Sequence, residues 1–142
     1  MSDEDIKIHR GLNNVYFDRT KTTYINGKEG VLEYRGYNIH DLSEKSSFEE
    51  VSYLLLYGKL PTKNELDSFN KSLKESREIP SKVIDIIRSI KESHPMDVLR
   101  TAVSALSAFD EEASDKSYDA TMRKGIRLTS QVPTIVMAHN AI

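Results

Sequence analysis

The sequence contains no cysteine, which excludes disulfide bonds and metal sites built from thiolates. It also lacks any apolar run close to the roughly 20 residues that a membrane-spanning helix requires. Residues 1–7 carry three acidic side chains and no apolar stretch, so they do not have the pattern of a secretory signal peptide. We therefore expect a soluble, globular protein of the cytoplasm.

A large charge of either sign is absent as well. The chain has 20 lysines and arginines against 22 aspartates and glutamates, which gives a formal net charge of −2. A chain so close to neutrality has no broad attraction for nucleic acids or anionic membranes, and we expect neither as a partner. Its 142 residues suffice for one domain with a modest core.

One region has the composition of β-strands. Residues 22–25 run into Asn26 and Gly27, and a second β-prone run, Val-Leu-Glu-Tyr at residues 31–34, follows after Gly30. Asn-Gly commonly forms the tight turn of a hairpin, because both residues tolerate a positive φ. The sequence thus predicts one short hairpin near residues 22–35, with a positive φ at Gly27 that makes Gly27→Val destabilising. Two strands alone are marginal in water, so the hairpin must lie on a helical body.

Most of the remaining chain carries helix signals. Ser47 with Glu50, and Thr62 with Glu65, have the spacing of capping boxes, in which side chains satisfy the free N–H groups of a first helical turn. Apolar residues then recur every three or four positions, as in helices that bury one face. We expect five to seven helices, and the ranges with the clearest signals are 48–57, 62–76, 81–90, 94–109 and 117–142.

The last two predicted helices differ from the others in charge. Residues 101–109 and 128–142 contain no aspartate, glutamate, lysine or arginine. Small and apolar side chains all round a helix indicate burial on more than one face. We therefore expect helices 94–109 and 117–142 to form a homodimer interface, since exposing them would leave a large apolar patch. The uncharged ending also leads us to expect a piece of a longer protein. In the alternative, the hairpin and the other helices cover both faces and the chain is a compact monomer.

Candidate catalytic groups are few and scattered. The four histidines are isolated from one another in the sequence: His9, His40, His94 and His139. No two of them have the spacing that binds a metal from one helical face. His94 precedes a proline at a helix start, which favours a capping role, and His139 lies on an apolar helix, which favours a structural one.

The paired carboxylates also point away from catalysis. Glu49-Glu50 and Glu111-Glu112 are adjacent residues, and adjacent residues on a helix do not face each other. A solvated first turn or loop explains both pairs. We therefore predict that this chain holds no catalytic, cofactor-binding or metal-binding residue.

Four strings in the same order resemble the citrate synthase family. They are Gly11–Ile39, with Tyr24–Ile39 matching most closely, Phe48–Thr62, Ile79-Pro80 and His94–Leu106. Together they place the resemblance over roughly Gly11 to Ile142, and the chain is identified as the N-terminal portion of a family member. Asn26 is a small departure, since many members carry aspartate there, and asparagine serves the same turn.

The resemblance implies an all-α fold, namely the N-terminal helical part of the large domain of a citrate synthase-like enzyme, with one short β-hairpin. Residues 1–10 are expected to be poorly ordered. The family consists of homodimeric acyltransferases that condense acetyl-CoA with oxaloacetate to give citrate and CoA, the entry step of the tricarboxylic acid cycle. Close relatives use propionyl-CoA and make 2-methylcitrate.

The resemblance also implies where the chemistry lies. The catalytic histidines and aspartate of the family, and the arginines that hold the substrate carboxylates, lie beyond this segment, and no position here matches them. The parent enzyme is thus expected to bind oxaloacetate and acetyl-CoA, whereas this fragment alone is expected to be inactive and to bind no cofactor. The choice between acetyl-CoA and propionyl-CoA stays open, because the acyl pocket of the family lies outside this segment.

Two other interpretations remain beside the enzyme fragment. One is a non-catalytic helical dimerisation or interaction module that keeps the family's interface, and the other is an unrelated α-helical domain. The coding sequence downstream of Ile142 distinguishes the interaction module from the enzyme fragment. Further His and Asp motifs there indicate an enzyme, and a stop codon indicates an interaction module.

Overall fold

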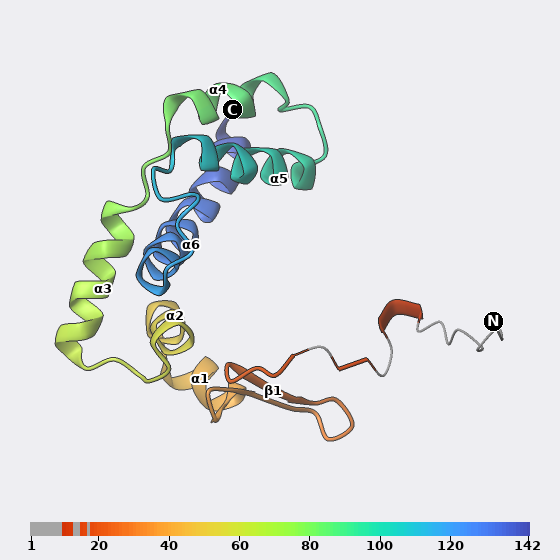
Figure 1. Cartoon of the computed structure of the whole chain (residues 1–142), viewed down its shortest axis with the longest axis vertical. Coiled ribbons are helices and arrows are strands. Elements are labelled where there is room, and N and C mark those ends of the chain that lie inside the picture. Colours follow the sequence, from red (N-terminus) through yellow and green to blue (C-terminus); the bar gives the residue numbers. More distant parts are fainter. Residues whose placement is uncertain (1–9, 13–14, 17) are drawn as a thin grey trace, which may run out of the picture.

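The computed structural model describes residues 10–12, 15–16 and 18–142. Within these residues, six α-helices make up most of the chain, and a small three-stranded antiparallel sheet lies at one end (Figure 1). The predicted helical class and the number of helices are confirmed. The expectation that the first residues are poorly ordered falls, for residues 1–9, outside the described residues.

The predicted helix ranges recur with shifts of at most a few residues. The elements, in chain order, are η1 (Arg10–Leu12), β1 (Thr23–Asn26), β2 (Val31–Tyr34), β3 (Tyr37–Asn38), α1 (Ile39–Lys45), α2 (Phe48–Tyr57), α3 (Lys63–Glu75), α4 (Ser81–Ser89), α5 (Pro95–Leu106), η2 (Ser107–Phe109) and α6 (Tyr118–Ala141). Three of them, η1, β3 and α1, were not predicted.

The hairpin lies where the sequence predicts it, but its turn is different. Asn26 pairs with Val31, so residues 27–30 form a four-residue loop in place of a tight Asn-Gly turn. The positive φ, 67°, belongs to Gly30 and not to Gly27, so the prediction for Gly27 is wrong. The cause is the Asn26 side chain, whose Oδ1 accepts hydrogen bonds from the backbone N–H groups of Lys28 and Glu29 at 3.2 and 3.4 Å. Asparagine here starts the turn through its side chain and does not supply the positive φ itself.

Arg35 attaches this sheet to the helices. Its Nη2 donates a hydrogen bond to the carbonyl of Leu55 in the last turn of α2, at 2.9 Å. The last carbonyls of a helix have no partner within the helix and carry its negative dipole end, so a guanidinium group there is favourable. The hairpin therefore lies on the helical body, as its marginal stability requires.

The two predicted capping boxes are present. The hydroxyl of Ser47 accepts from the N–H of Glu50, and the Glu50 carboxylate accepts from the N–H of Ser47. Thr62 and Glu65 form the same pair at α3. Gly58 ends α2 with a φ of 82°, a left-handed cap that glycine adopts without strain.

The core consists of two clusters that α6 connects. The larger one joins α4, α5 and α6 and contains Val83, Ile87, Val98, Ala102, Leu106 and Ile135. The smaller one joins α2 and α3 around Tyr53, Phe69 and Leu73, with Ile126 of α6 packed against it. Figure 1 shows α6 running from beside α2 towards α4 and α5, with α3 along its side. The apolar residues that recur every three or four positions along these helices thus form the core.

Candidate functional site

Two of the three histidines that the structure describes make hydrogen bonds that support the fold. His94 is the N-cap of α5, where its Nδ1 accepts a hydrogen bond from the backbone N–H of Met96 at 3.2 Å. The Nε2 of His139 lies 3.1 Å from the carbonyl of Lys91, so it joins α6 to the segment after α4 when it carries the proton. The capping role of His94 and the structural role of His139 are confirmed. His40 is exposed on α1, and His9 lies outside the described residues.

The described residues contain neither a cluster of metal ligands nor a membrane-spanning helix. Between residues 10 and 142, apart from the gaps at 13–14 and 17, no three His, Asp or Glu side chains gather closely enough to hold a metal ion. No helix in that part of the chain has the length and hydropathy needed to cross a membrane.

The carboxylates at residues 110–112 belong to a charged network on the loop between α5 and α6. Arg127 on α6 donates from Nη2 to both carboxylate oxygens of Asp110 and from Nη1 to Glu112, each at 2.8 Å. Arg123 donates from Nε to the same Glu112 carboxylate, also at 2.8 Å. The Nζ of Lys124 donates to the Glu112 carbonyl at 3.1 Å. These contacts bind the loop to the first three turns of α6. We call Asp110, Glu112, Arg123 and Arg127 the loop network.

The loop network is fully charged at neutral pH. Hydrogen bonds from Arg123 and then Arg127 lower the pKa of Glu112 to about 2. The hydrogen bond from Arg127 lowers the pKa of Asp110, and the same bond raises the pKa of Arg127. General acid–base catalysis needs a group that titrates near the working pH. The network is therefore suited to fixing a loop and not to moving protons.

A groove of about 520 Å³ lies beside the loop network, between α5 and α6. Its apolar lining comes from Pro80, Val103, Leu106, Phe109, Ala113 and Leu128. Two cations also line it, but Arg127 is engaged by carboxylates and Lys124 by a carbonyl. Because these charges already have partners, the groove favours uncharged groups over an anion. We call it the α5–α6 groove.

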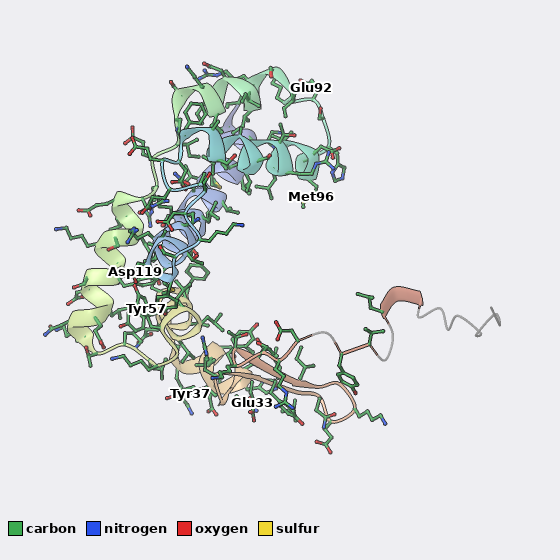
Figure 2. The ribbon with its side chains drawn as sticks, in the orientation of Figure 1. Glu33, Tyr37, Tyr57, Glu92, Met96 and Asp119 are labelled. Carbon is green, nitrogen blue, oxygen red and sulfur yellow. The ribbon has the colours of Figure 1, made fainter. Side chains whose placement is uncertain are left out.

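An uncharged strip lies on the last turns of α6. Its exposed members are Pro133, Val136, Met137 and Asn140, which lie within two helical turns on one side of the helix. Met137 is 63% exposed and Val136 is 49% exposed, whereas Ile135 of the same helix lies in the core and is 1% exposed. Met96, also exposed, lies at the first turn of α5 (Figure 2). We call the four α6 residues the α6 strip.

The α6 strip lies on the second of the two helices, 94–109 and 117–142, that the sequence predicts to form an interface. α4 and α5 pack on the side of α6 that carries Ile135, whereas α3 contacts α6 near Ile126, nine residues earlier and about 180° around the helix. Val136 and Met137 themselves stay exposed, with no other described part of the chain covering them. Among the described residues, the rest of the chain thus covers only part of α6, and the partner that would cover the strip is a matter for proposal.

Comparison with known proteins identifies one family. The family model described as "Citrate synthase, C-terminal domain" matches residues 11–142. The chain is 45% identical over 134 residues to a citrate synthase of Deinococcus radiodurans, a match that covers 94% of the chain and 36% of that protein. It is 40% identical over 133 residues to 2-methylcitrate synthase 1 of Corynebacterium glutamicum, covering 93% and 35% of the two chains.

The fold agrees with a solved relative. The crystal structure of citrate synthase from Pyrobaculum aerophilum superposes with a TM-score of 0.87 at 38% identity, covering 93% of this chain and 35% of that one. The chain thus spans about a third of the length of the relatives that it matches. The family model is described as a C-terminal domain, so the comparisons support the family but not the expected position in its N-terminal portion.

Proposed function

The chain belongs to the citrate synthase family, and we propose that it is a non-catalytic, subunit-joining part of the large domain of such an enzyme. The parent enzyme would condense acetyl-CoA with oxaloacetate to give citrate and CoA, the entry step of the tricarboxylic acid cycle, in the cytoplasm. The observation that carries this proposal is the match over residues 11–142 together with its span of about a third of each relative.

The absence of catalysis from this part rests on how its polar groups are used. His94 and His139 are held by backbone groups of the fold, and Asp110 and Glu112 are held by arginines. The family mechanism, by resemblance, needs histidines that polarise carbonyl groups and an aspartate that removes a proton. Neither His94 nor His139 has an aspartate among its hydrogen-bond partners, and Asp110 is held by Arg127.

The test is an assay for CoA thiol release from acetyl-CoA and oxaloacetate with the purified 142-residue chain. We expect no turnover above a heat-denatured control, whereas the intact Deinococcus radiodurans relative run in parallel should be active. Turnover by the chain well above the denatured control would overturn the proposal, because it would place a complete catalytic centre within these residues.

We further propose that the chain forms a homodimer through α5 and α6. The support is the α6 strip, whose exposed apolar residues continue from a helix that is otherwise part of the core. A non-catalytic dimerisation module that keeps this surface is the alternative to an enzyme part. The coding sequence after Ile142 separates them, since the enzyme requires further His and Asp motifs.

A second candidate activity is the synthesis of 2-methylcitrate from propionyl-CoA. The observation in its favour is the 40% identity to the Corynebacterium glutamicum 2-methylcitrate synthase. Competition between acetyl-CoA and propionyl-CoA in an assay of the complete parent enzyme decides between the two. A preference for acetyl-CoA retains the first proposal, and a preference for propionyl-CoA replaces it with the second.

A further inference from the structure

We propose that the α5–α6 groove is the docking site for the part of a citrate synthase subunit that this chain does not span, so that the chain joins that part when it is supplied as a separate polypeptide. The inference rests on the proposed function, because the partner is the remainder of the same enzyme. The inference goes beyond the proposed function in two respects. It assigns the contact to one surface of this chain, and it states that the contact forms without a covalent connection.

The size of the relatives establishes that such a contact surface exists. The chain superposes with a TM-score of 0.87 on 35% of the Pyrobaculum aerophilum subunit. The other two thirds of that subunit must pack on some of the surface that is exposed here. The question is therefore which surface of the chain receives it.

The lining of the groove matches a polypeptide with apolar side chains. Phe109 and Leu128 face the groove and are still 42% and 39% exposed, so a partner would remove both from water. The volume of about 520 Å³ admits more than one large side chain. Arg127 and Lys124 already have partners on the loop, so the site offers no unpaired cation to an anionic small molecule.

The groove is also held in shape before any partner arrives. Asp110, Glu112 and Arg127 line it and at the same time bind the loop to α6. A wall that is fixed in advance loses little conformational freedom on binding, which favours association of separate chains. This is the property that docking without a covalent link requires.

The groove and the proposed dimer surface lie on different sides of α6. Leu128, in the groove, and Met137, in the α6 strip, are nine residues apart, which corresponds to a rotation of about 180° around a helix with 3.6 residues per turn. A second copy can thus cover the α6 strip while the remainder of a subunit occupies the groove. The two contacts can be tested separately by one substitution each.

The experiment is co-expression of the tagged 142-residue chain with the Deinococcus radiodurans relative from which the matched third has been deleted. We expect the two polypeptides to co-purify in equal amounts and to release CoA thiol from acetyl-CoA and oxaloacetate, which neither does alone. Leu128→Glu should reduce the co-purified remainder at least tenfold and leave the dimer of the chain intact. Met137→Glu, the matched control, should weaken the dimer and retain the remainder, and circular dichroism checks that both variants are folded.

The outcomes separate the possible occupants. If Leu128→Glu dissociates the dimer, the groove holds a second copy and the inference is overturned. If the wild-type chain binds no remainder, or if Leu128→Glu binds it as well as the wild type does, the inference is likewise overturned. A dimeric, inactive chain that binds no remainder would still leave the proposed function standing, whereas turnover by the chain alone would remove the proposed function itself.

Discussion

At the scale of single residues, Gly27 and Gly30 share one loop but have different backbone conformations. A β-carbon added at either would meet no atom within 4 Å, so crowding does not distinguish them. Only Gly30 has a positive φ, which costs a residue with a side chain about 1–2 kcal/mol. We expect Gly30→Val to lower the free energy of unfolding by about that amount and Gly27→Val to lower it much less. Urea denaturation of the two variants checks this, and equal losses would contradict the assigned turn.

Glu112 gives the chain a pH-dependent contribution to stability. Its pKa is about 2 in the folded chain because of Arg123 and Arg127, below the usual value of about 4.3 in an unfolded chain. A lowered pKa means that the contribution is complete above the unfolded value and disappears as the pH falls from about 4 towards 2. Glu112→Gln should therefore lower the thermal midpoint at pH 7 and have a smaller effect at pH 2.5. Circular dichroism at both pH values measures this, with the exposed neighbour variant Glu111→Gln as a control that should follow the parent. A constant difference between Glu112→Gln and the parent would refute the role of the carboxylate.

The loop network shows why individual contacts were harder to predict than helices. Arg127 lies 17 residues after Asp110 and 15 after Glu112, a spacing that no helical or strand period produces. The sequence assigned Glu111 and Glu112 to a solvated turn or loop and contained no signal for the arginine partners of Glu112. Asn26 is a similar case, because its side-chain hydrogen bonds, and not the Asn-Gly pair, decide the form of the turn.

At the scale of elements, the caps provide a direct test of why the helices begin where they do. Thr62 accepts the N–H of Glu65 at α3, whereas the N-cap residue of α4 is Pro80, which makes no side-chain cap hydrogen bond. We expect Thr62→Ala to lower the free energy of unfolding by about 1 kcal/mol, the usual value of an N-cap. Ser81→Ala, at the first residue of α4, should change it by less than about 0.5 kcal/mol. Chemical denaturation measures both, and a larger loss at Ser81 would contradict the assignment.

Helix α1 was missed by the sequence patterns, whereas helix α6 was predicted by them. Helix α1 has seven residues, too few for an apolar period, although Asn38 at its N-cap accepts the N–H of His40 and was an available signal. Helix α6 continues through Pro133, which has no N–H to donate to the preceding turn. The predicted range 117–142 is still right, because burial of Ile135 beyond the proline outweighs the missing hydrogen bond.

At the scale of the whole molecule, the strings that resemble citrate synthases predicted the helical class and the family, because each string corresponds to a local element. The α5–α6 groove could not be predicted in this way. Its lining combines Pro80 before α4, Val103 of α5 and Leu128 of α6, which only the packing of three helices brings together. The absence of a catalytic site remains a prediction for the assay of CoA release.

The oligomeric state is the prediction that follows from the molecule as a whole. The α6 strip exposes Val136 and Met137 on a helix that has no charged residue after Arg127. Covering an apolar patch of several hundred Å² contributes on the order of 10 kcal/mol before the costs of association, at about 25 cal/mol per Å². The same surface of a second copy is the natural cover, since self-association usually follows a two-fold axis.

We therefore expect light scattering coupled to size exclusion to give twice the 16.2 kDa of one chain at tens of micromolar. Met137→Glu should shift the species towards one chain, because each two-fold contact would then bury two carboxylates without partners. Ser72→Glu, which adds the same charge on the exposed side of α3, should leave the mass unchanged. A wild-type mass of one chain would refute the interface. An unchanged dimer in Met137→Glu would instead place the contact on another face. The α5–α6 groove would then be the first surface to test, because it is the other apolar surface on α6 that the described residues leave uncovered.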